Sequence, residues 1–435
     1  MKIKDVLDID YFLLLPVMVI MAIGILFIYS SGITSAGEIV STEYIRQIVW
    51  ASAGLIIVFA LSMINYRRFY NISLYLYLFT LILLVYIAVF GAVGARWIRI
   101  GTFGLQISEF TKVTTILLLA RFLASTERSS QPFLRFILSC VIVIIPMGIV
   151  LIQPDLGTAL VFIPILLSMV LIAGVSLRYV LFAVCCIVLT SLFLFLPLWQ
   201  TFILQRSIPV IALLTDIRLI LIAILAFSVI ALIALFGYLK YKKKSFFWIL
   251  YVVAIVALSL GISYAARGIL RHYQIMRLIV FMDPQIDPRG AGWNIIQSVI
   301  AIGAGGLTGQ GFLQGTQSYY RFLPEQSTDF IFSIFSEETG FLGGIILFAL
   351  YLIIFLRILR LIKITADPFA VNICAGLVGV YGFHFLINVG MTMGIMPITG
   401  IPLLFMSYGG SALFSAMIGI GLIMSIHVRR YNRGP

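Results

Sequence analysis

Charged residues are scarce in this chain, and their scarcity indicates whether the protein is soluble or membrane-embedded. Of 435 residues, 62% are hydrophobic and only 10% are charged. A water-soluble protein of this composition would have too little polar surface to cover itself. The sequence therefore excludes a soluble globular protein and predicts one that uses lipid as its solvent.

Cysteine and histidine are also rare. The four cysteines lie inside apolar runs without ligand spacing, so the sequence indicates neither a disulfide framework nor a metal site. Only three histidines occur, which argues against a histidine-ligated zinc centre. The short charged start, Met1 to Asp10, leads into apolar residues without a small-residue cleavage site. We therefore expect the first apolar run to be a retained span.

Long apolar runs take the place of polar surface. A spanning helix needs roughly 20 mainly apolar residues, and twelve runs reach or approach that length. They predict an all-α, polytopic transmembrane helical bundle. The predicted spans are 11–31, 45–64, 69–90, 108–124, 134–152, 158–175, 178–198, 217–238, 246–265, 329–359, 370–392 and 403–427.

The positive charge is concentrated between these runs. A net charge of +13 would suggest nucleic-acid binding in a soluble protein. Here the cations fall in alternate connecting loops, for example at Arg67 and Arg68 and at Lys240 to Lys244. That distribution is the positive-inside pattern of membrane proteins. It predicts cytoplasmic N- and C-termini, with the spans in a cytoplasmic membrane, and gives no reason to expect a nucleic-acid partner.

With that orientation, the longest outer connection is 266–328, far beyond usual loop lengths. It contains two Asp-Pro pairs, beginning at Asp283 and Asp287, together with glycines and the basic residues Arg277 and Arg289. Proline restricts the backbone conformation of the residue before it, and glycines let the backbone come close to other groups. The guanidinium of arginine matches the geometry of phosphate. This combination indicates a carboxylate held near a phosphate-bearing lipid. The alternative is that these residues only form turns.

A second set of polar residues lies just before the fourth predicted span, within that span, and in the turn before the sixth. Trp97 and Arg96 fit either an interfacial anchor beside lipid headgroups or a site. Glu109 and Lys112 are spaced i, i+3, so they share a helical face, where they form a structural ion pair or part of a functional site. Asp155 is placed to cap the next helix, and it too is a candidate site residue.

The C-terminal third carries polar residues inside predicted spans. Asp329, Ser333, Ser336 and Glu337 fall near one face of the tenth span and predict a buried polar seam. Such a seam either only packs inside the bundle or also contacts a substrate. A turn rich in Gly and Pro follows, and at membrane depth it must be covered by protein.

Three stretches resemble the successive signatures of the RodA/FtsW/SpoVE (SEDS) family. They read DPQIDPRGAGWNIIQSVIAIGAGGLTGQGF, GTQSYYRFLPEQSTDFIFSIFSEETGFLGG and MPITGIPLLFMSYGGSALFS. The GTQ before FLPE favours the RodA elongation branch over the FtsW division branch. The resemblance implies a peptidoglycan glycosyltransferase that polymerises lipid II at the outer face of the membrane, with lipid II or a lipid-linked glycan as donor.

The resemblance also implies roles for individual residues. The family's essential aspartate falls on Asp287, which we expect to act as the general base, and its key Trp and Lys fall on Trp97 and Lys112. Glu109 and Asp155 occupy the acidic positions of two family motifs. The expected substrate-binding residues are Trp97, Lys112, Glu109, Arg96, Arg277, Arg289, Asp155, Gln297, Glu325 and Asp329.

Cofactor and partners follow from the same resemblance. Family members are expected to use Mg or Mn, and this sequence shows no dedicated metal cage, in keeping with an ion held partly by substrate pyrophosphate. A class B penicillin-binding protein, a transpeptidase, is the expected partner, alongside other proteins of the elongation machinery. Ile107, Ser327 and Leu404 depart from the family's usual residues, and Ser327 removes any role for a histidine there.

The expected organisation has five parts, and it includes an apparent inserted hairpin beyond the family's usual ten spans. The parts are an N-terminal bundle (1–198), the inserted hairpin (199–245), a further span (246–265), an outer catalytic loop (266–328) and a C-terminal bundle (329–435). The competing functions are a lipid II flippase or other transporter, a division-type polymerase, and a scaffold that only recruits other enzymes.

Overall fold

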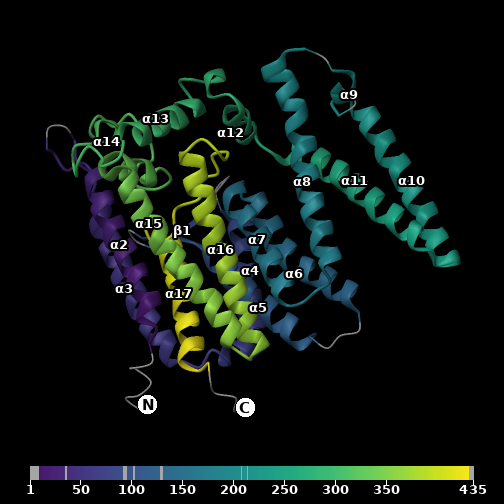
Figure 1. Ribbon diagram of the computed structural model, residues 1–435, viewed down its shortest axis with the longest axis horizontal. Coiled ribbons are helices and arrows are strands. Elements are labelled where there is room, and N and C mark those ends of the chain that lie inside the picture. The colour runs from purple at the N-terminus through teal and green to yellow at the C-terminus, as the bar shows by residue number, and fades with distance from the viewer. Residues whose placement is uncertain are drawn as a thin grey trace. The chain divides into compact units, whose positions relative to one another are not determined.

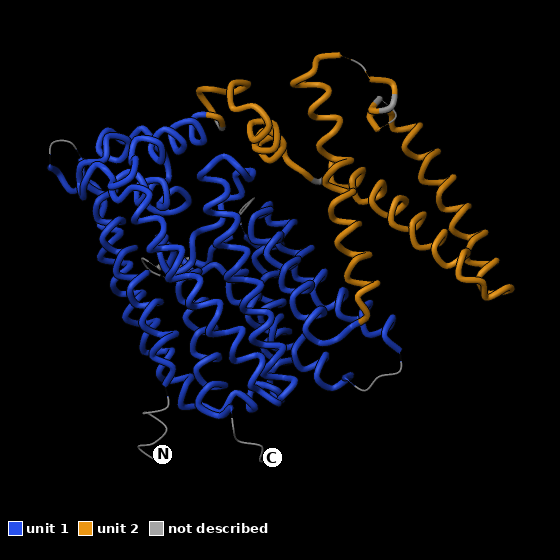
Figure 2. Tube along the Cα trace, viewed as in Figure 1, with its two compact units in different colours: residues 1–175, 293–435 blue, residues 176–292 orange. Residues whose placement is uncertain are grey.

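The computed structural model describes residues 9–34, 37–91, 96–100, 103–127, 131–206, 208–212 and 214–430. Its internal contacts divide the chain into two compact units (Figure 2). The first unit comprises residues 1–175 and 293–435, and the second comprises residues 176–292. The domain boundaries expected from the sequence stay predictions.

Helices dominate the first unit (Figure 1). A short antiparallel hairpin also belongs to this unit. It is formed by β1 (Trp97–Ile100) and β2 (Phe103–Gln106), in which Trp97 pairs with Gln106. The helices before residue 176 are α2 (Tyr11–Ser31), α3 (Glu43–Met63), α4 (Arg68–Phe90), α5 (Ile107–Ser125), α6 (Pro132–Ile152) and α7 (Leu156–Ile172). After residue 292 come α14 (Thr316–Tyr319), α15 (Ile331–Ile364), α16 (Pro368–Thr392) and α17 (Gly410–Val428).

The second unit consists mainly of helices. They are α8 (Leu177–Trp199), η1 (Gln200–Leu204), α9 (Pro209–Ala212), α10 (Ile217–Tyr241), α11 (Lys244–Ile269) and α12 (His272–Met282). A short 3-10 helix, η2 (Pro284–Ile286), follows α12, and α13 (Ala291–Ala304) spans the point in the sequence at which the units divide. Within this unit, α10 packs along α11, and α11 packs along α8.

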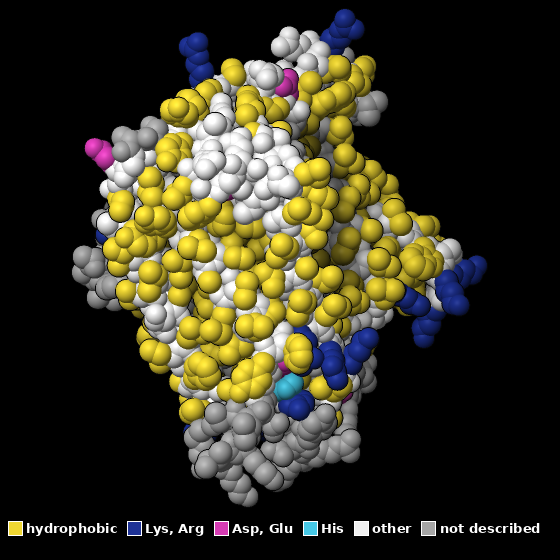
Figure 3. All heavy atoms as spheres, turned by 60° about the vertical axis from the view of Figure 1, so that its left-hand side comes forward, with side chains coloured by type: hydrophobic (Ala, Val, Ile, Leu, Met, Phe, Trp, Pro, Cys, Tyr) yellow, Lys and Arg dark blue, Asp and Glu magenta, His cyan; other side chains and the backbone are white. Residues whose placement is uncertain are grey.

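Among the described residues, ten helices are long and apolar enough to cross a membrane. α5 and α7 occupy two further predicted spans, but α7 has only 17 residues and α5 carries Glu109 and Lys112. Large hydrophobic side chains are exposed along these helices and cover much of the face seen in Figure 3. The protein is therefore a multi-pass, all-α membrane protein, as its composition predicted.

α5 lies inside the first unit and not on its lipid-facing surface. It packs against α4, α6, α7, α16 and α17, and most of its side chains are buried. This placement explains its polar composition, because side chains that do not face lipid can be polar when they are paired. The buried position makes α5 the helix most suited to carry a site.

One predicted helix boundary and one span predicted to be uninterrupted need correction. The last span was expected to begin at 403, but α17 begins at Gly410. Gly400 and Phe405 adopt positive φ angles of 73° and 70°, which interrupt a helix, so the chain forms an irregular segment there. The tenth span is broken at Gly340, where φ is 66° and ψ is −164°.

Candidate functional site

Glu109 and Lys112 form an ion pair inside the first unit. Lys112 Nζ lies 2.8 Å from each carboxylate oxygen of Glu109, and the two residues are only 2% and 3% exposed. Glu109 lies in the first turn of α5, where the helix dipole favours a carboxylate. The pairing suggested by the i, i+3 spacing is therefore confirmed.

Two further side chains complete this cluster, and sequence reasoning missed both. His384 of α16 places Nε2 3.2 Å from Lys112 Nζ, and its Nδ1 lies 2.9 Å from the carbonyl oxygen of Pro402. Ser415 of α17 donates to Glu109 Oε2 over 3.3 Å. The cluster thus joins three helices. Only the rarity of histidine in the sequence offered a signal for His384.

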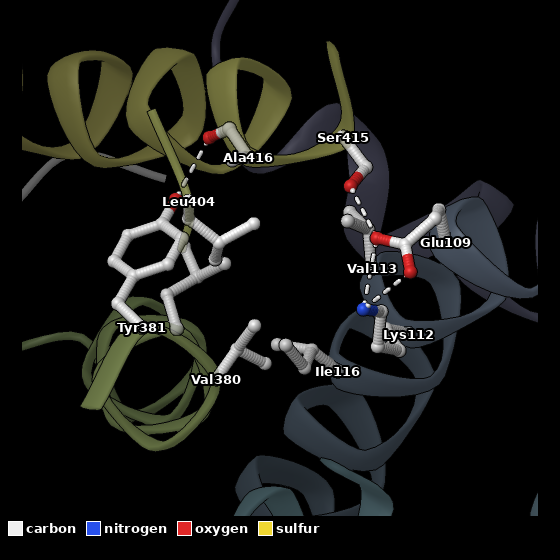
Figure 4. Close-up of a pocket in the computed structure, with 10 residues that line it drawn as sticks. Glu109, Lys112, Val113, Ile116, Val380, Tyr381, Leu404, Ser415 and Ala416 are labelled. Carbon is white, nitrogen blue, oxygen red and sulfur yellow. Dashed lines mark hydrogen bonds and ion pairs between the residues drawn. The ribbon is translucent and has the colours of Figure 1, made fainter. Parts of the chain in front are cut away.

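A small cavity borders the cluster (Figure 4). Ten residues line this cavity, and it has room for about one water molecule. Tyr381 closes one side, where its hydroxyl donates to the carbonyl oxygen of Ala416 over 2.8 Å (Figure 4). Lys112 and Glu109 line the opposite side of the cavity. The cavity is thus too small for a sugar or a pyrophosphate in this arrangement.

Asp155 caps α7, as the sequence suggested. Its carboxylate accepts hydrogen bonds from the Thr158 backbone N–H at 3.1 Å and from the Thr158 hydroxyl at 3.0 Å. Gln106, at the end of β2, donates to the same carboxylate over 2.9 Å, and the guanidinium of Arg96 lies 3.9 Å away. The carboxylate therefore ties the β hairpin to the start of α7.

Arg96 is engaged mainly with backbone. Its guanidinium donates to the carbonyl oxygens of Gln153 and Pro154 at 3.2 and 2.5 Å. These contacts hold the residue before β1 against the turn between α6 and α7. Trp97, the next residue, is 48% exposed and its ring lies over Gly104, where a Cβ would approach it to 3.2 Å.

Glu337 and Glu338 anchor the segment that precedes α15. Of the polar seam expected in that span, Ser333, Ser336 and Glu337 are buried and Asp329 is partly exposed. Glu337 Oε1 accepts from the Thr316 hydroxyl at 3.0 Å and from the Gln317 N–H at 2.8 Å. Glu338 accepts from the Leu313 N–H at 2.9 Å and from the Ser30 hydroxyl. Both carboxylates thus bind the loop before α15 and hold it against the bundle.

The break at Gly340 belongs to the same loop. The N–H groups of Phe341 and Leu342 donate to the carbonyls of Gly306 and Leu307 at 2.9 and 3.1 Å. A Cβ at Gly340 would lie 2.3 Å from the Gly309 nitrogen. The loop therefore inserts into α15 where only glycine leaves room.

In the second unit, the two Asp-Pro aspartates differ in what they do. Asp283 Oδ1 accepts from the Gln285 N–H at 2.9 Å and caps η2. Asp287 directly follows η2 and is partly exposed. Its carboxylate covers Gly290, where a Cβ would approach Oδ2 to 2.2 Å. Its backbone carbonyl accepts from the Gly292 N–H at 3.0 Å. Asp283 is thus a local structural residue, and Asp287 stays the candidate base.

The remaining predicted residues are spread over both units. In the second unit, Arg277 lies over the Tyr273 ring at 5.7 Å, and Arg289 is exposed. In the first unit, Gln297 of α13 is buried. Near the start of α15, Glu325 is exposed and accepts from the Thr328 hydroxyl at 3.2 Å; the backbone carbonyl of Asp329 accepts from Asn388 at 2.9 Å.

The first unit thus brings the predicted residues into two groups, Glu109 with Lys112 and Arg96 with Asp155. Asp287, Arg277 and Arg289 belong to the second unit. Within the described part of the chain, no three His, Cys, Asp or Glu side chains gather closely enough to hold a metal ion. The described residues therefore offer no preformed cage for a resident metal ion.

The whole chain matches one family of proteins. The model of the FtsW/RodA/SpoVE family, described as "Cell cycle protein", matches residues 11–208 and 200–432. The peptidoglycan glycosyltransferase RodA of Treponema pallidum is 49% identical over 435 residues, covering 99% of this chain and 100% of that protein. The peptidoglycan glycosyltransferase MrdB of Escherichia coli K12 is 32% identical, covering 98% and 95%.

Solved structures agree with this match. A structure described as "Structural coordination of polymerization and crosslinking by a peptidoglycan synthase complex" has a TM-score of 0.67 and 26% identity, covering 98% of this chain and 99% of that one. The rod shape determining protein RodA of Thermus thermophilus has a TM-score of 0.60 and 22% identity, covering 98% of each chain, and it supports the fold alone. This chain belongs to the FtsW/RodA/SpoVE family.

Proposed function

We propose that this chain is a peptidoglycan glycosyltransferase that polymerises lipid II at the outer face of the cytoplasmic membrane during cell elongation. The observation that carries the proposal is the full-length match, at 49% identity, to a RodA named as a peptidoglycan glycosyltransferase. The GTQ at Gly315 to Gln317 supports an elongation role over a division role. Both termini then lie in the cytoplasm.

Asp287 is the proposed general base. It takes the proton from the acceptor sugar hydroxyl while that oxygen bonds to the anomeric carbon of the donor, and the bond from that carbon to the undecaprenyl pyrophosphate oxygen breaks. The partial exposure of Asp287 supports this role, because a base must reach its substrate. Gly290 supports it too, since the absence of a side chain there leaves room for the carboxylate.

The leaving pyrophosphate needs positive charge. Arg277, Arg289, Arg96 and Lys112 are the proposed sources, with Trp97, Glu109, Asp155, Gln297, Glu325 and Asp329 shaping or lining the substrate site. Because the described residues form no metal cage, we propose that Mg or Mn arrives bound to the pyrophosphate. Such an ion needs few protein ligands when phosphate oxygens supply the others.

A class B penicillin-binding protein is the proposed partner, together with other proteins of the elongation machinery. A similar solved structure is described as a peptidoglycan synthase complex that coordinates polymerization and crosslinking. A polymerase whose product is crosslinked by a transpeptidase benefits from being held beside it. The transporter alternative, a lipid II flippase, would need the same cationic surface but no base.

The test is polymerisation by the purified chain with lipid II and Mg or Mn. We expect glycan strands from the wild type, none after chelation, and a rate loss of about 10²–10⁴-fold for Asp287→Asn. Asp283→Asn is the matched control, because an amide oxygen still caps η2; its rate should stay within a few-fold of wild type. Equal rates for wild type and Asp287→Asn would refute the base assignment. Lipid translocation without polymer would favour the flippase.

A further inference from the structure

Protein groups from two helices surround the Lys112 ammonium. A lysine ammonium has three N–H donors and no acceptor. Lys112 Nζ donates to Glu109 Oε1 at 2.8 Å, and Glu109 Oε2 lies at the same distance in the ion pair. His384 Nε2 lies 3.2 Å from the same nitrogen. Because Lys112 is only 2% exposed, this arrangement does not present its ammonium to a substrate.

The partners of His384 fix where its proton lies. The carbonyl oxygen of Pro402 can only accept a hydrogen bond, so Nδ1, 2.9 Å away, carries the hydrogen. A neutral imidazole then has a lone pair at Nε2, and that lone pair faces the Lys112 ammonium. Protonation at Nε2 would turn an N–H toward an ammonium 3.2 Å away, which like charges oppose.

Packing holds the imidazole in this orientation. His384 is 1% exposed. Gly157 at the start of α7 helps to place its carbonyl partner, because a Cβ there would lie 2.4 Å from the Thr399 carbonyl oxygen. The segment from Thr399 to Pro402 therefore approaches α7 closely.

We propose that His384 is a positioning residue for glycosyl transfer. As the neutral Nδ1–H tautomer it accepts an N–H of Lys112 and fixes the direction of the Glu109–Lys112 pair. The inference rests on the proposed function, in which that ion pair contributes a preorganised dipole to the site. Since Lys112 is buried, the pair acts on the transition state through the field of its dipole and not by direct contact with the substrate.

This arrangement predicts a separation of kinetic constants. His384→Leu removes both hydrogen bonds of the imidazole and should lower kcat by about 10–100-fold, since small misplacements of a site group have effects of this size. KM should change less than about twofold, because Lys112 makes no ground-state contact with substrate. His384→Gln carries an amide acceptor and an amide donor and should restore kcat to within a few-fold of wild type.

The experiment is steady-state polymerisation of lipid II by purified wild type, both His384 variants and His427→Leu, with thermal unfolding measured on each. His427, on α17 beside Asp10 at 3.5 Å, is the matched control and should keep wild-type kinetics. Should His384→Leu not fold, His384→Asn takes its place, since the shorter amide cannot span both partners and should lose rate. Unchanged kcat, an equal loss in Leu and Gln variants, or a raised KM would overturn the inference. A wild type without polymerase activity would instead overturn the proposed function.

Discussion

Removing one member of the Glu109–Lys112 pair should destabilise the protein far more than removing both charges. Lys112→Met leaves a carboxylate 3% exposed, and Glu109→Gln leaves an ammonium 2% exposed. An uncompensated buried charge costs about 3–5 kcal/mol, so each single variant should lose that much free energy of unfolding. The double variant removes both charges and keeps similar side-chain volumes. Its loss should be only about 1 kcal/mol.

The assay is denaturant unfolding in mixed micelles for wild type, both single variants and the double variant, arranged as a double-mutant cycle. The two single losses sum to about 6–10 kcal/mol, so a large coupling energy is expected between the residues. Lipid II polymerisation should fall in all three variants, including the stable double variant. A double variant whose loss equals the sum of the single losses would refute the buried ion pair as the source of the effect.

The other predictions concern the helix break at Gly340 and the hydrogen bond between Tyr66 and Asp367. Gly340→Ala should cost about 1–3 kcal/mol, because φ there is 66° and a Cβ would meet Gly309. Gly344→Ala, with no neighbour within 4 Å, should cost nothing in the same thermal unfolding assay; equal losses would show that the break is unimportant. Burial, with the hydrogen bond to Asp367, raises the pKa of Tyr66 from 10.0 to about 12. Tyr66→Phe should therefore be less stable than wild type below pH 10, and the difference should vanish between pH 10 and about 12; a constant difference would contradict this.

Hydropathy located the helices well because lipid exposure is a property of the local sequence. Runs such as 11–31 and 370–392 match α2 and α16 closely. The break at Gly340 was not predicted, because a glycine in an apolar run carries no local sign of a kink. The loop that inserts there bonds Phe341 to Gly306 and Leu342 to Leu307, which lie far apart in the sequence, and only the folded chain brings them together.

The same distinction separates predicted from missed site residues. Glu109 and Lys112 share one helical face, so their i, i+3 spacing predicted that they would pair. His384 and Ser415 lie 272 and 306 residues from their partners, and no spacing rule connects them. The two Asp-Pro aspartates are alike in sequence, and only the hydrogen bond of Asp283 to the Gln285 N–H reveals its capping role.

The basic residues proposed for the pyrophosphate fall into two physical kinds. Lys112 and Arg96 are bound by protein acceptors, a carboxylate and an imidazole for Lys112 and two backbone carbonyls for Arg96. Arg96 is partly exposed, whereas the Glu109–Lys112 pair is buried. A buried ion pair contributes a fixed dipole, whose positive end can stabilise developing negative charge at no cost in reorganisation. Arg289 is exposed and follows the Asp287-Pro288 pair directly, so its guanidinium can contact phosphate oxygens bidentately. Direct contact should therefore govern substrate binding, and the buried pair should govern the rate of transfer.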